Sequence, residues 1–316
     1  MRFIITGATG FIGTTTALAL LDAGHLVHGI DEMSDYYDPA LKRMNLSALH
    51  EHSNFSFSPR DLTSGCEDLF EGAEVVIHLA AQPGVRKSWL DFTSYARANV
   101  EATKHVLDLS LRFGVQRVVY ASSSSVYGNA TRYPTPESTQ PSPASPYAVT
   151  KLAGEQLCSV FALEHGLSTV SLRYFTVYGP RQRPDMLTHR LIDAAHTGEP
   201  VTIFGDGNQI RDFTFVGDVA RANVAAAHAD VSAGSVYNIA GGSAVSVNDM
   251  IEAVEHATGR RVPRVTAPQS AGDVEQTGAD VGRAYTELGW SPDVDLADGL
   301  ASQVVAYRSA HRLAVV

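Results

Sequence analysis

The sequence predicts an α/β fold: a Rossmann-type, doubly wound parallel sheet with a smaller, mainly helical C-terminal lobe. Three observations favour it. Short apolar segments rich in β-branched residues alternate with longer helical patterns as far as residue 175. A glycine-rich turn directly follows the first of these segments. After residue 178 the rhythm changes to turn-rich segments and helices, which indicates a second lobe.

The expected strands are nearly continuous apolar runs, as strands of a parallel sheet covered on both faces are. They are residues 2–6, 26–30, 55–58, 74–80, 117–123 and 168–175. Helical patterns between them cover residues 13–24, 91–114 and 145–166. Ser145 and Pro146 suit the start of the last of these helices, because serine is a good N-cap and proline fits the first helical position.

The C-terminal lobe begins with the turn-rich stretches "PRQRPDM" and "FGDGNQIRD". Its helices are expected at residues 186–198, 217–229, 247–258 and 296–312. We therefore predict a first domain over residues 1–178 and a second over 179–316, with part of 212–240 returning to the first domain.

Composition narrows the class of protein. The net charge is -10 and there is no run of Lys and Arg, which argues against a nucleic-acid partner. The only two cysteines, Cys66 and Cys158, are far apart, which favours a reducing compartment. No signal peptide precedes the first strand, and no apolar run approaches the ~20 residues of a spanning helix. We expect a cytoplasmic protein with no membrane partner and no metal.

The glycine loop "ITGATGFIG" lies between the first strand and the first helix. Gly7 allows a tight turn, Gly10 lets the backbone approach a pyrophosphate at the helix N-terminus, and Gly13 allows close packing of helix on strand. The spacing is G-x-x-G-x-x-G rather than the usual G-x-G-x-x-G, so the surrounding strand and helix carry the interpretation. The loop predicts a dinucleotide site.

Asp31 closes the second expected strand, where an acidic side chain can bind a ribose 2′-hydroxyl. A 2′-phosphate would meet the like charges of Asp31 and Glu32. These residues predict NAD rather than NADP; the alternative is that Asp31 is a simple turn residue.

A serine run, Ser122 to Ser125, ends the fifth expected strand, and Tyr147 and Lys151 follow within one turn of the next helix. The carboxyl ends of parallel strands form the ligand crevice of an open sheet. Tyrosine has a reference pKa of about 10, and a nearby cation favours its phenolate. Serine, tyrosine and lysine together can bind a substrate hydroxyl and take its proton. Taken alone, the spacing of Tyr147 and Lys151 favours an ordinary surface pair.

The chain resembles the extended short-chain dehydrogenase/reductases, specifically the nucleotide-sugar 4-epimerases. The resemblance covers nearly the whole chain. It rests on "TGATGFIG", "HLAAQPGVR", "YASSSSVYG", "SPYAVTK", "LRYFTVYGP" and "IRDFTFVGDVARA".

The resemblance implies NAD as cofactor and Ser123, Tyr147 and Lys151 as the catalytic triad. Around NAD it places Gly7, Gly10, Phe11, Ile12, Gly13, Asp31, Glu32, Asp61, Leu62, Leu79, Ala80, Ala81, Asn99, Tyr147, Lys151 and Tyr174, with Asp61 at the adenine. Arg211 is expected at the substrate pyrophosphate; the alternative is a structural ion pair with Asp212 or Asp218.

Three stretches, residues 29–46, 81–90 and 173–187, are similar to UDP-glucuronate 4-epimerases. Where UDP-galactose 4-epimerases usually carry asparagine, this chain has Thr176. Hydroxyls of Thr176, Ser124 and Ser125 can donate to a C6 carboxylate, which only accepts hydrogen bonds. Generic pocket lining is the alternative for all three.

Further substrate-binding candidates are Ser123, Tyr147, Arg86 and Arg183, with Arg183 expected at the diphosphate and a structural role left open for Arg86. The chain departs from the family at Glu32, where asparagine is common, and at Arg181–Gln182, where Trp-Gly is common.

The expected reaction is therefore 4-epimerisation of UDP-glucuronate to UDP-galacturonate through a 4-keto sugar with internal hydride return. Related decarboxylases carry a glutamate directly before V-Y-G, where this chain has Ser125, and related 4,6-dehydratases carry an Asp-Glu pair that is absent from the serine run. The alternatives are a UDP-glucose/UDP-galactose 4-epimerase and, more remotely, a catalytically inactive NAD-sensing protein.

The resemblance also implies a homodimer. Relatives pair the helices that correspond to residues 91–112 and 146–165 into a four-helix interface. Leu107, Leu111, Leu157 and Phe161 are extra apolar positions on these helices. The alternative is that these faces pack only on their own sheet.

Overall fold

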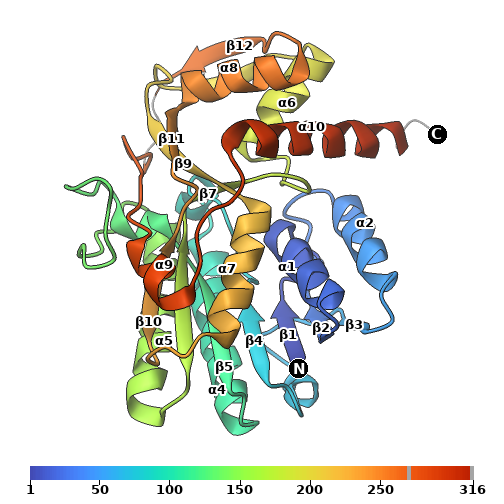
Figure 1. Cartoon of the computed structure of the whole chain (residues 1–316), viewed down its shortest axis with the longest axis vertical. Helices are drawn as coiled ribbons and strands as arrows, with labels where there is room; N and C mark the ends of the chain where they lie inside the picture. The colour runs from blue at the N-terminus through green and yellow to red at the C-terminus, as the bar shows by residue number, and fades with distance from the viewer. Residues whose placement is uncertain (269–271, 314–316) are drawn as a thin grey trace.

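The computed structural model describes residues 1–268 and 272–313, and within them a seven-stranded parallel sheet forms the centre (Figure 1). The strands lie in the order β10-β6-β5-β4-β1-β2-β3. They are β1 (Arg2–Thr6), β2 (Leu26–Ile30), β3 (Phe55–Ser58), β4 (Val75–His78), β5 (Arg117–Ser123), β6 (Thr169–Tyr174) and β10 (Ser235–Ile239). The register sets Thr6 beside His78 and Ser123 beside Tyr174, so the carboxyl ends of the central strands share one edge.

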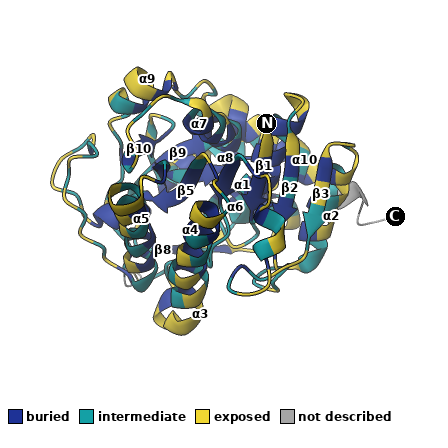
Figure 2. Ribbon diagram, turned by 90° about the horizontal axis from the view of Figure 1, so that it is seen from below, coloured by how far each residue is buried: buried dark blue, intermediate teal, exposed yellow. Residues whose placement is uncertain are grey.

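Each face of the sheet is covered by helices because alternate strand residues are apolar on both sides. Phe3 and Ile5 of β1 pack in the core with α1 (Phe11–Asp22) and α7 (Val216–His228), whereas Ile4 belongs to a second core under α4 (Ala102–Arg112) and α5 (Pro146–His165). Figure 2 shows these two helix layers on either side of the buried strands. The doubly wound fold predicted from the sequence is confirmed.

The expected helix at 91–114 is interrupted. It consists of α3 (Phe92–Ala96), a π-helical segment (Arg97–Glu101) and α4. A π turn inserts one residue into the helix and is common at functional sites. Here it turns the Asn99 side chain inward, where only 1% of the residue is exposed.

Shorter elements complete this part of the chain. α2 (Pro39–His50) follows β2, and 3₁₀ turns cover Glu67–Phe70, Lys87–Trp89 and Ser124–Tyr127. Ser145 caps α5 by accepting from the N–H of Ala148, as its sequence position predicted.

The upper lobe in Figure 1 has its own core. α6 (Leu187–Thr197), α8 (Val247–Thr258) and α10 (Leu296–Leu313) bury Leu191, Ile251 and Leu300 against one another. Small sheets that the sequence analysis missed support them. They are β7 (Thr176–Tyr178), β9 (Ile210–Phe215) and β11 (Ser243–Ser246) in one, and β8 (Val201–Phe204) with β12 (Arg264–Ala267) in the other.

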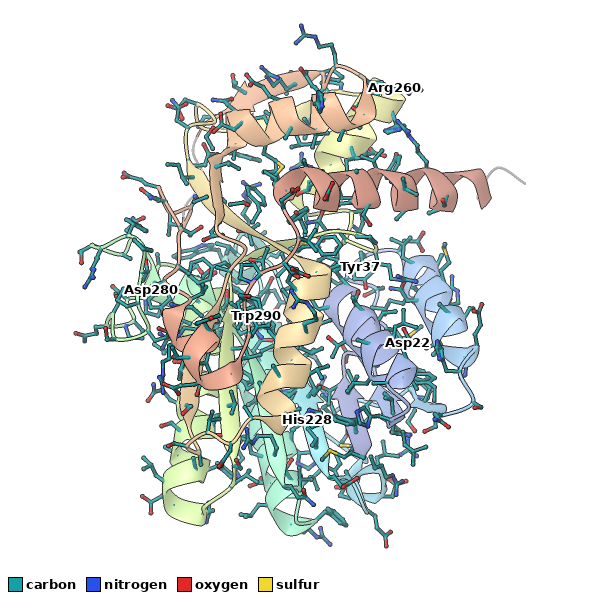
Figure 3. The ribbon with its side chains drawn as sticks, viewed as in Figure 1. Asp22, Tyr37, His228, Arg260, Asp280 and Trp290 are labelled. Atoms are coloured by element: carbon teal, nitrogen blue, oxygen red, sulfur yellow. The ribbon has the colours of Figure 1, made fainter. Side chains whose placement is uncertain are left out.

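Not all of the chain after residue 178 belongs to the upper lobe. β10 is the edge strand of the large sheet, and α7 packs on α1. α9 (Gly282–Leu288) lies against β10. Trp290, beside α7 in Figure 3, donates its indole N–H to the carbonyl of Asp218 at 2.9 Å. The division at residue 178 stays a prediction.

Two of the residues expected on a dimer surface are wrong for that role. Leu107 is fully buried and Phe161 is 7% exposed, and both belong to the core between the helices and their own sheet. Leu111, a third expected residue, is 39% exposed, and Val149, Val160 and Leu163 are further apolar side chains that these helices expose.

Among the helices that the structure describes, none combines the length and the apolar character needed to cross a bilayer.

Candidate active site

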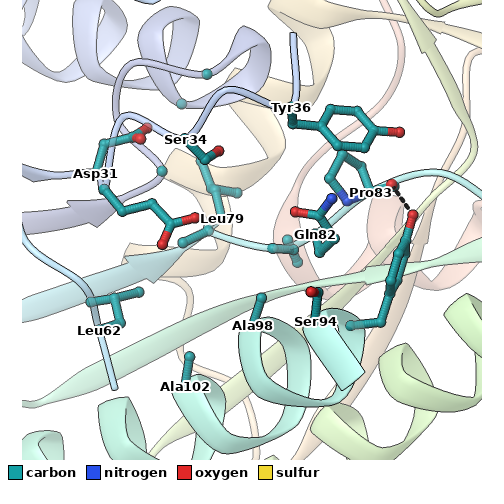
Figure 4. Close-up of a pocket in the computed structure, with 18 of the residues that line it drawn as sticks. Asp31, Ser34, Tyr36, Leu62, Leu79, Gln82, Pro83, Ser94, Ala98 and Ala102 are labelled. Atoms are coloured by element: carbon teal, nitrogen blue, oxygen red, sulfur yellow. Dashed lines mark hydrogen bonds between the residues drawn. The ribbon is translucent and has the colours of Figure 1, made fainter. Parts of the chain in front are cut away.

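A cavity of about 750 Å³ opens at the carboxyl edge of the sheet (Figure 4). It runs from the glycine loop to Tyr147. We call these its glycine-loop end and its tyrosine end. Most of the residues expected at the cofactor line it. They are Gly7, Gly10, Phe11, Ile12, Gly13, Asp31, Glu32, Asp61, Leu62, Leu79, Ala80, Ala81, Tyr147, Lys151 and Tyr174.

The glycine loop is a cradle that side chains would fill. A Cβ on Gly13 would lie 2.0 Å from the carbonyl oxygen of Gly7. One on Gly7, whose φ is +70°, would lie 2.8 Å from the backbone nitrogen of Ala80. Glycine is required at both positions because helix, loop and β4 meet backbone to backbone. The cradle therefore fits a dinucleotide whose pyrophosphate lies at the N-terminus of α1.

Asp31 is more heavily engaged than the sequence indicated. Its carboxylate accepts from the Thr9 hydroxyl at 2.7 Å and from the Met33 N–H at 2.8 Å. The buried ammonium of Lys42 lies 3.1 Å away. Asp31 thus locks the glycine loop to α2, and its charge is balanced within the protein.

Glu32 and Asp61 face each other across the glycine-loop end. Burial, and then the charge of Asp61, raise the pKa of Glu32. Burial alone would raise the pKa of Asp61, but hydrogen bonds from Thr63 and the ion pair with Arg97 lower it overall. The net negative charge at this end comes from Glu32, because Lys42 pairs with Asp31 and Arg97 pairs with Asp61.

Tyr147 and Ser123 meet at the other end. The Ser123 hydroxyl hydrogen-bonds the Tyr147 phenol. Burial raises the pKa of Tyr147, while this bond and the charge of Arg183 act in the opposite direction. The phenol is therefore harder to ionise than a free tyrosine, whereas the sequence had suggested that its pKa is lowered.

Lys151 lies one helical turn beyond Tyr147 and is 4% exposed. Its ammonium donates to the carbonyl of Ala121 at 2.8 Å. Burial lowers its pKa to about 8. His78 of β4 hydrogen-bonds Thr6 and Thr103, and burial together with the charge of Lys151 lowers its pKa to about 3.

Arg183 lines the cavity close to Tyr147. Its guanidinium makes a two-pronged pair with Asp185, with both N–O distances at 2.9 Å. It also lies over the ring of Tyr36, 5.9 Å from the centroid. The structure places Arg183 at the tyrosine end of the cavity, and its expected contact with a diphosphate stays a prediction.

The serine run divides its hydroxyls between two tasks. Ser122 donates to Glu155 at 2.7 Å, within a buried network that includes Arg173 and Tyr127. Ser123 and Ser125 hydrogen-bond each other at 3.1 Å. Ser124 and Ser125 start a 3₁₀ turn, and none of Ser123, Ser124, Ser125 and Thr176 is among the cavity lining. Thr176 starts β7, two residues after the strand partner of Ser123.

Two arginines expected at the substrate lie outside the cavity lining. Arg211 pairs with Asp273 at 2.7 Å, not with Asp212 or Asp218 as its structural alternative supposed. Arg86 stacks on the ring of Phe204, 3.6 Å from the centroid. Both arginines lie near Asp273, since its charge acts on the pKa of Arg86, which burial lowers.

Asn99 also lies behind the cavity wall rather than in it. Its amide accepts from the N–H of Gln82 at 2.7 Å and donates to Thr150 at 3.0 Å. Asn99 thereby ties the loop after β4 to α5, the helix that carries Tyr147 and Lys151.

Three functional residues were missed from the sequence: Lys42, Arg97 and Tyr36. Each acts through a partner more than ten positions away, so no local pattern marks it. Their only sequence signal was the quoted similarity of residues 29–46, which includes Tyr36 and Lys42.

Known proteins share this architecture. A Bacillus subtilis protein named as an uncharacterised UDP-glucose epimerase, YtcB, is 41% identical over 313 residues, which is 98% of each chain. A UDP-glucuronate 4-epimerase of Thermodesulfobacterium geofontis is 36% identical over 307 residues, 96% of this chain and 94% of its own.

Among solved structures, the UDP-glucuronic acid 4-epimerase from Bacillus cereus, in complex with UDP-glucuronic acid and NAD, is 40% identical. It matches with a TM-score of 0.94 over 98% of this chain and 100% of that one. The model of the NAD dependent epimerase/dehydratase family matches residues 3–240, which is three quarters of the chain. This range contains the strands of the large sheet apart from Arg2, the first residue of β1. This chain belongs to the NAD dependent epimerase/dehydratase family.

Proposed function

We propose that this enzyme is an NAD-dependent 4-epimerase that converts UDP-glucuronate to UDP-galacturonate. The observation that carries the proposal is the single cavity that joins a dinucleotide cradle to Tyr147, with Ser123 bonded to the phenol and Lys151 one turn away. Similarity to the Bacillus cereus enzyme, which binds UDP-glucuronic acid and NAD, supports the choice of sugar. Residues 1–178, with part of 212–240, would hold the cofactor, and the rest would bind the UDP-sugar.

Tyr147 is the catalytic base. Its phenolate takes the proton of the sugar 4-hydroxyl, with Ser123 bridging. NAD, when bound, supplies the acceptor and then the donor of the hydride at C4. Burial opposes ionisation of Tyr147, so the Ser123 hydrogen bond and the charge of Arg183 are needed to bring the phenolate within reach. Lys151, one helical turn away, is the second cation that we propose for this role.

The 4-keto sugar then rotates within the site, so that its opposite face is presented to the cofactor, while its nucleotide stays bound. Tyr147 returns the proton after the hydride has been delivered to the opposite face. Ser124, Ser125 and Thr176 would hold the carboxylate meanwhile. A carboxylate held out of line with the carbonyl π system resists loss of carbon dioxide, which favours epimerisation. Arg86, Arg183 and Arg211 are the cations available for the acidic groups of the ligand.

The test is to incubate the purified protein with UDP-glucuronate in heavy water and to follow it by NMR. We expect UDP-galacturonate with protium at C4 and no net change in redox state. Deuterium at C4 would exclude internal hydride return. Turnover of UDP-glucose in a parallel sample, with none of UDP-glucuronate, would favour the UDP-glucose/UDP-galactose 4-epimerase instead. Absence of both bound NAD and turnover would favour the inactive NAD-sensing protein.

We also propose that the protein is a homodimer. A groove between the α3–α4 region and α5 is lined by Phe92, Val149 and Leu157. Nearby on α5, Val160 is 50% and Leu163 80% exposed. Apolar side chains that share one surface are typical of a subunit interface.

Light scattering at micromolar concentration tests the dimer. Val149→Glu should produce monomers, because a charge in the interface is left unpaired. Val265→Glu is the matched control, since Val265 is equally exposed, at 50%, on β12 of the upper lobe. A monomeric mass for the unmodified protein would contradict the proposal.

We further infer a cytoplasmic location. Cys66 and Cys158 are both buried free thiols, as is common in a reducing compartment.

A further inference from the structure

Tyr36 belongs to the loop after β2, which begins at the glycine-loop end of the cavity, yet its side chain reaches the tyrosine end. Figure 4 shows its ring beside Pro83, far from Asp31 of the same loop. Its phenol hydrogen-bonds Tyr95 of α3. A Cβ on Gly84 would lie 2.5 Å from the phenol oxygen, so the tyrosine fits only because this position is glycine.

Two cationic side chains also lie over the ring of Tyr36. The Lys87 ammonium lies 4.0 Å from the ring centroid and the Arg183 guanidinium 5.9 Å from it. A cation over an aromatic face is attracted by the ring quadrupole, and Arg183 gains this contact in addition to its pair with Asp185.

Tyr95 completes the link to the catalytic residue. It donates to the carbonyls of Pro83 at 2.5 Å and Gly84 at 2.7 Å. Its ring meets that of Tyr147 edge to face, with centroids 6.3 Å apart. Tyr36 therefore touches both neighbours of Tyr147: the aromatic ring that packs on it and the arginine whose charge acts on it.

We propose that Tyr36 is a positioning residue for the reaction, which holds Arg183 beside the phenol of Tyr147 and so sets the pH at which Tyr147 ionises. The proposal rests on the proposed function for its kinetic consequence. It adds that the cofactor-side loop takes part in preparing the catalytic base.

Several groups face Tyr147 and must be considered together. Arg183 is the cation that favours its phenolate, and Ser123 bonds it. The phenols of Tyr36, Tyr95 and Tyr120 lie close enough to be affected by its charge. Lys151 lies one turn along the helix, bonded to Ala121. Of these groups, Tyr36 is the one that contacts Arg183 through its ring.

The test compares Tyr36→Leu, Tyr36→Phe and Tyr37→Leu. Leucine removes the aromatic face; phenylalanine keeps the face and loses only the phenol bond. Tyr37 is the matched control, because the cation over its ring is Lys42, 5.6 Å from the centroid, whereas Arg183 affects Tyr37 through its charge. We expect Tyr36→Leu to lower kcat near neutral pH about threefold to tenfold, the range of a partly buried cation–π contact. In the pH–rate profile of Tyr36→Leu, the acidic limb should move to higher pH. The profiles of Tyr36→Phe and Tyr37→Leu should keep the acidic limb of the unmodified enzyme.

A titration without substrate keeps this result separate from the proposed function. The ultraviolet absorbance of the phenolate is followed in the NAD-bound protein, and the signal of Tyr147 is obtained by subtracting the same titration of Tyr147→Phe. Ionisation of Tyr147 at higher pH in Tyr36→Leu supports the proposal even if UDP-glucuronate is not turned over. An unchanged titration, or an equal shift in Tyr37→Leu, overturns it. Bound NAD is measured in every variant, and Tyr36→Met replaces Tyr36→Leu if that variant loses its cofactor.

Discussion

The two ends of the cavity hold their charged groups in different ways. At the glycine-loop end, Asp31 and Lys42 form an ion pair whose side chains are only 6% and 8% exposed, and Asp31 also binds backbone and hydroxyl donors. At the tyrosine end, Arg183 pairs with Asp185, whose side chain is 38% exposed. Arg211, in the upper lobe, pairs with Asp273, which is 27% exposed.

This difference suits two kinds of ligand. A buried carboxylate cannot leave its partner without a large desolvation cost, so the Asp31–Lys42 pair is fixed before anything binds. At the same end, Asp61 is 33% exposed in its pair with Arg97 and is not fixed in this way. A carboxylate that is one third exposed can turn into water at little cost and leave its arginine to another anion. The first arrangement suits a cofactor that stays, and the second suits a substrate that enters and leaves at each turnover.

The largest expected effect concerns the tyrosine end alone. Tyr147→Phe should reduce kcat by about 10²–10⁴-fold, the usual contribution of a general base, and should leave NAD bound. NAD released on denaturation and turnover measured by NMR check the two parts separately. Loss of NAD together with activity would show that the two ends are not independent.

The second prediction concerns the buried ion pair of Asp31 and Lys42. Lys42→Met leaves Asp31 buried without its cation, and should lower the free energy of unfolding by about 3–5 kcal/mol. Asp185→Asn is the matched control at the exposed pair, where a loss of no more than about 1 kcal/mol is expected. Urea unfolding measures both. Equal losses would remove the distinction between the two ends.

Asp212 sharpens the comparison, because it is buried with backbone donors and pairs with no cation in the part of the chain that the structure describes. It is 2% exposed and accepts from the N–H of Ala279 at 3.2 Å. Burial raises its pKa to about 6. The folded state therefore binds the proton more tightly than the unfolded chain, and Asp212 stabilises the fold less as the pH rises from about 4 to about 6.

The size of this loss is up to about 3 kcal/mol, since each unit of pKa shift corresponds to about 1.4 kcal/mol. Urea unfolding at several pH values checks it against Asp212→Asn, which has no carboxyl to titrate. We expect the unmodified protein to lose stability relative to Asp212→Asn across that interval. Parallel curves would show that Asp212 does not titrate there.

The smallest predicted effect concerns the choice of sugar. Thr176→Asn should lower kcat/KM for UDP-glucuronate, with a loss of transition-state stabilisation of about 1.5–3 kcal/mol, the value of a hydrogen bond to a charged group. The loss for UDP-glucose should be smaller. Steady-state kinetics on both nucleotides give the comparison. The same loss on both would remove Thr176 from carboxylate recognition.

The sequence was sufficient where structure is local. The glycine loop, the strands of the large sheet and the cap at Ser145 follow from short patterns, and the resemblance supplied the position of Tyr147. Contacts between distant segments could not be predicted. Nothing near Asp31 in the chain shows that Lys42 neutralises it, and nothing near Arg183 shows that it lies beside Tyr147.

Periodicity also failed in recognisable places. The π turn at 97–101 leaves the apolar pattern of a helix nearly unchanged, so a single helix was expected. Leu107 and Phe161 are apolar residues on helices that have a buried and an exposed face, and the pattern alone did not separate the faces. β8 and β12 are only four residues each and lie among turn residues, which conceals a strand.

The chain passes back and forth between the large sheet and the upper lobe. It leaves the sheet after β6, returns from β9 into α7, leaves again after β10 and once more after α9. A lobe joined by one linker can swing in any direction and can be removed by a single cut. A lobe joined by several connecting segments has fewer ways to move relative to the sheet, and one cut cannot remove it. A fragment that ends at residue 178 would lack β10 and α7 and expose the core they cover.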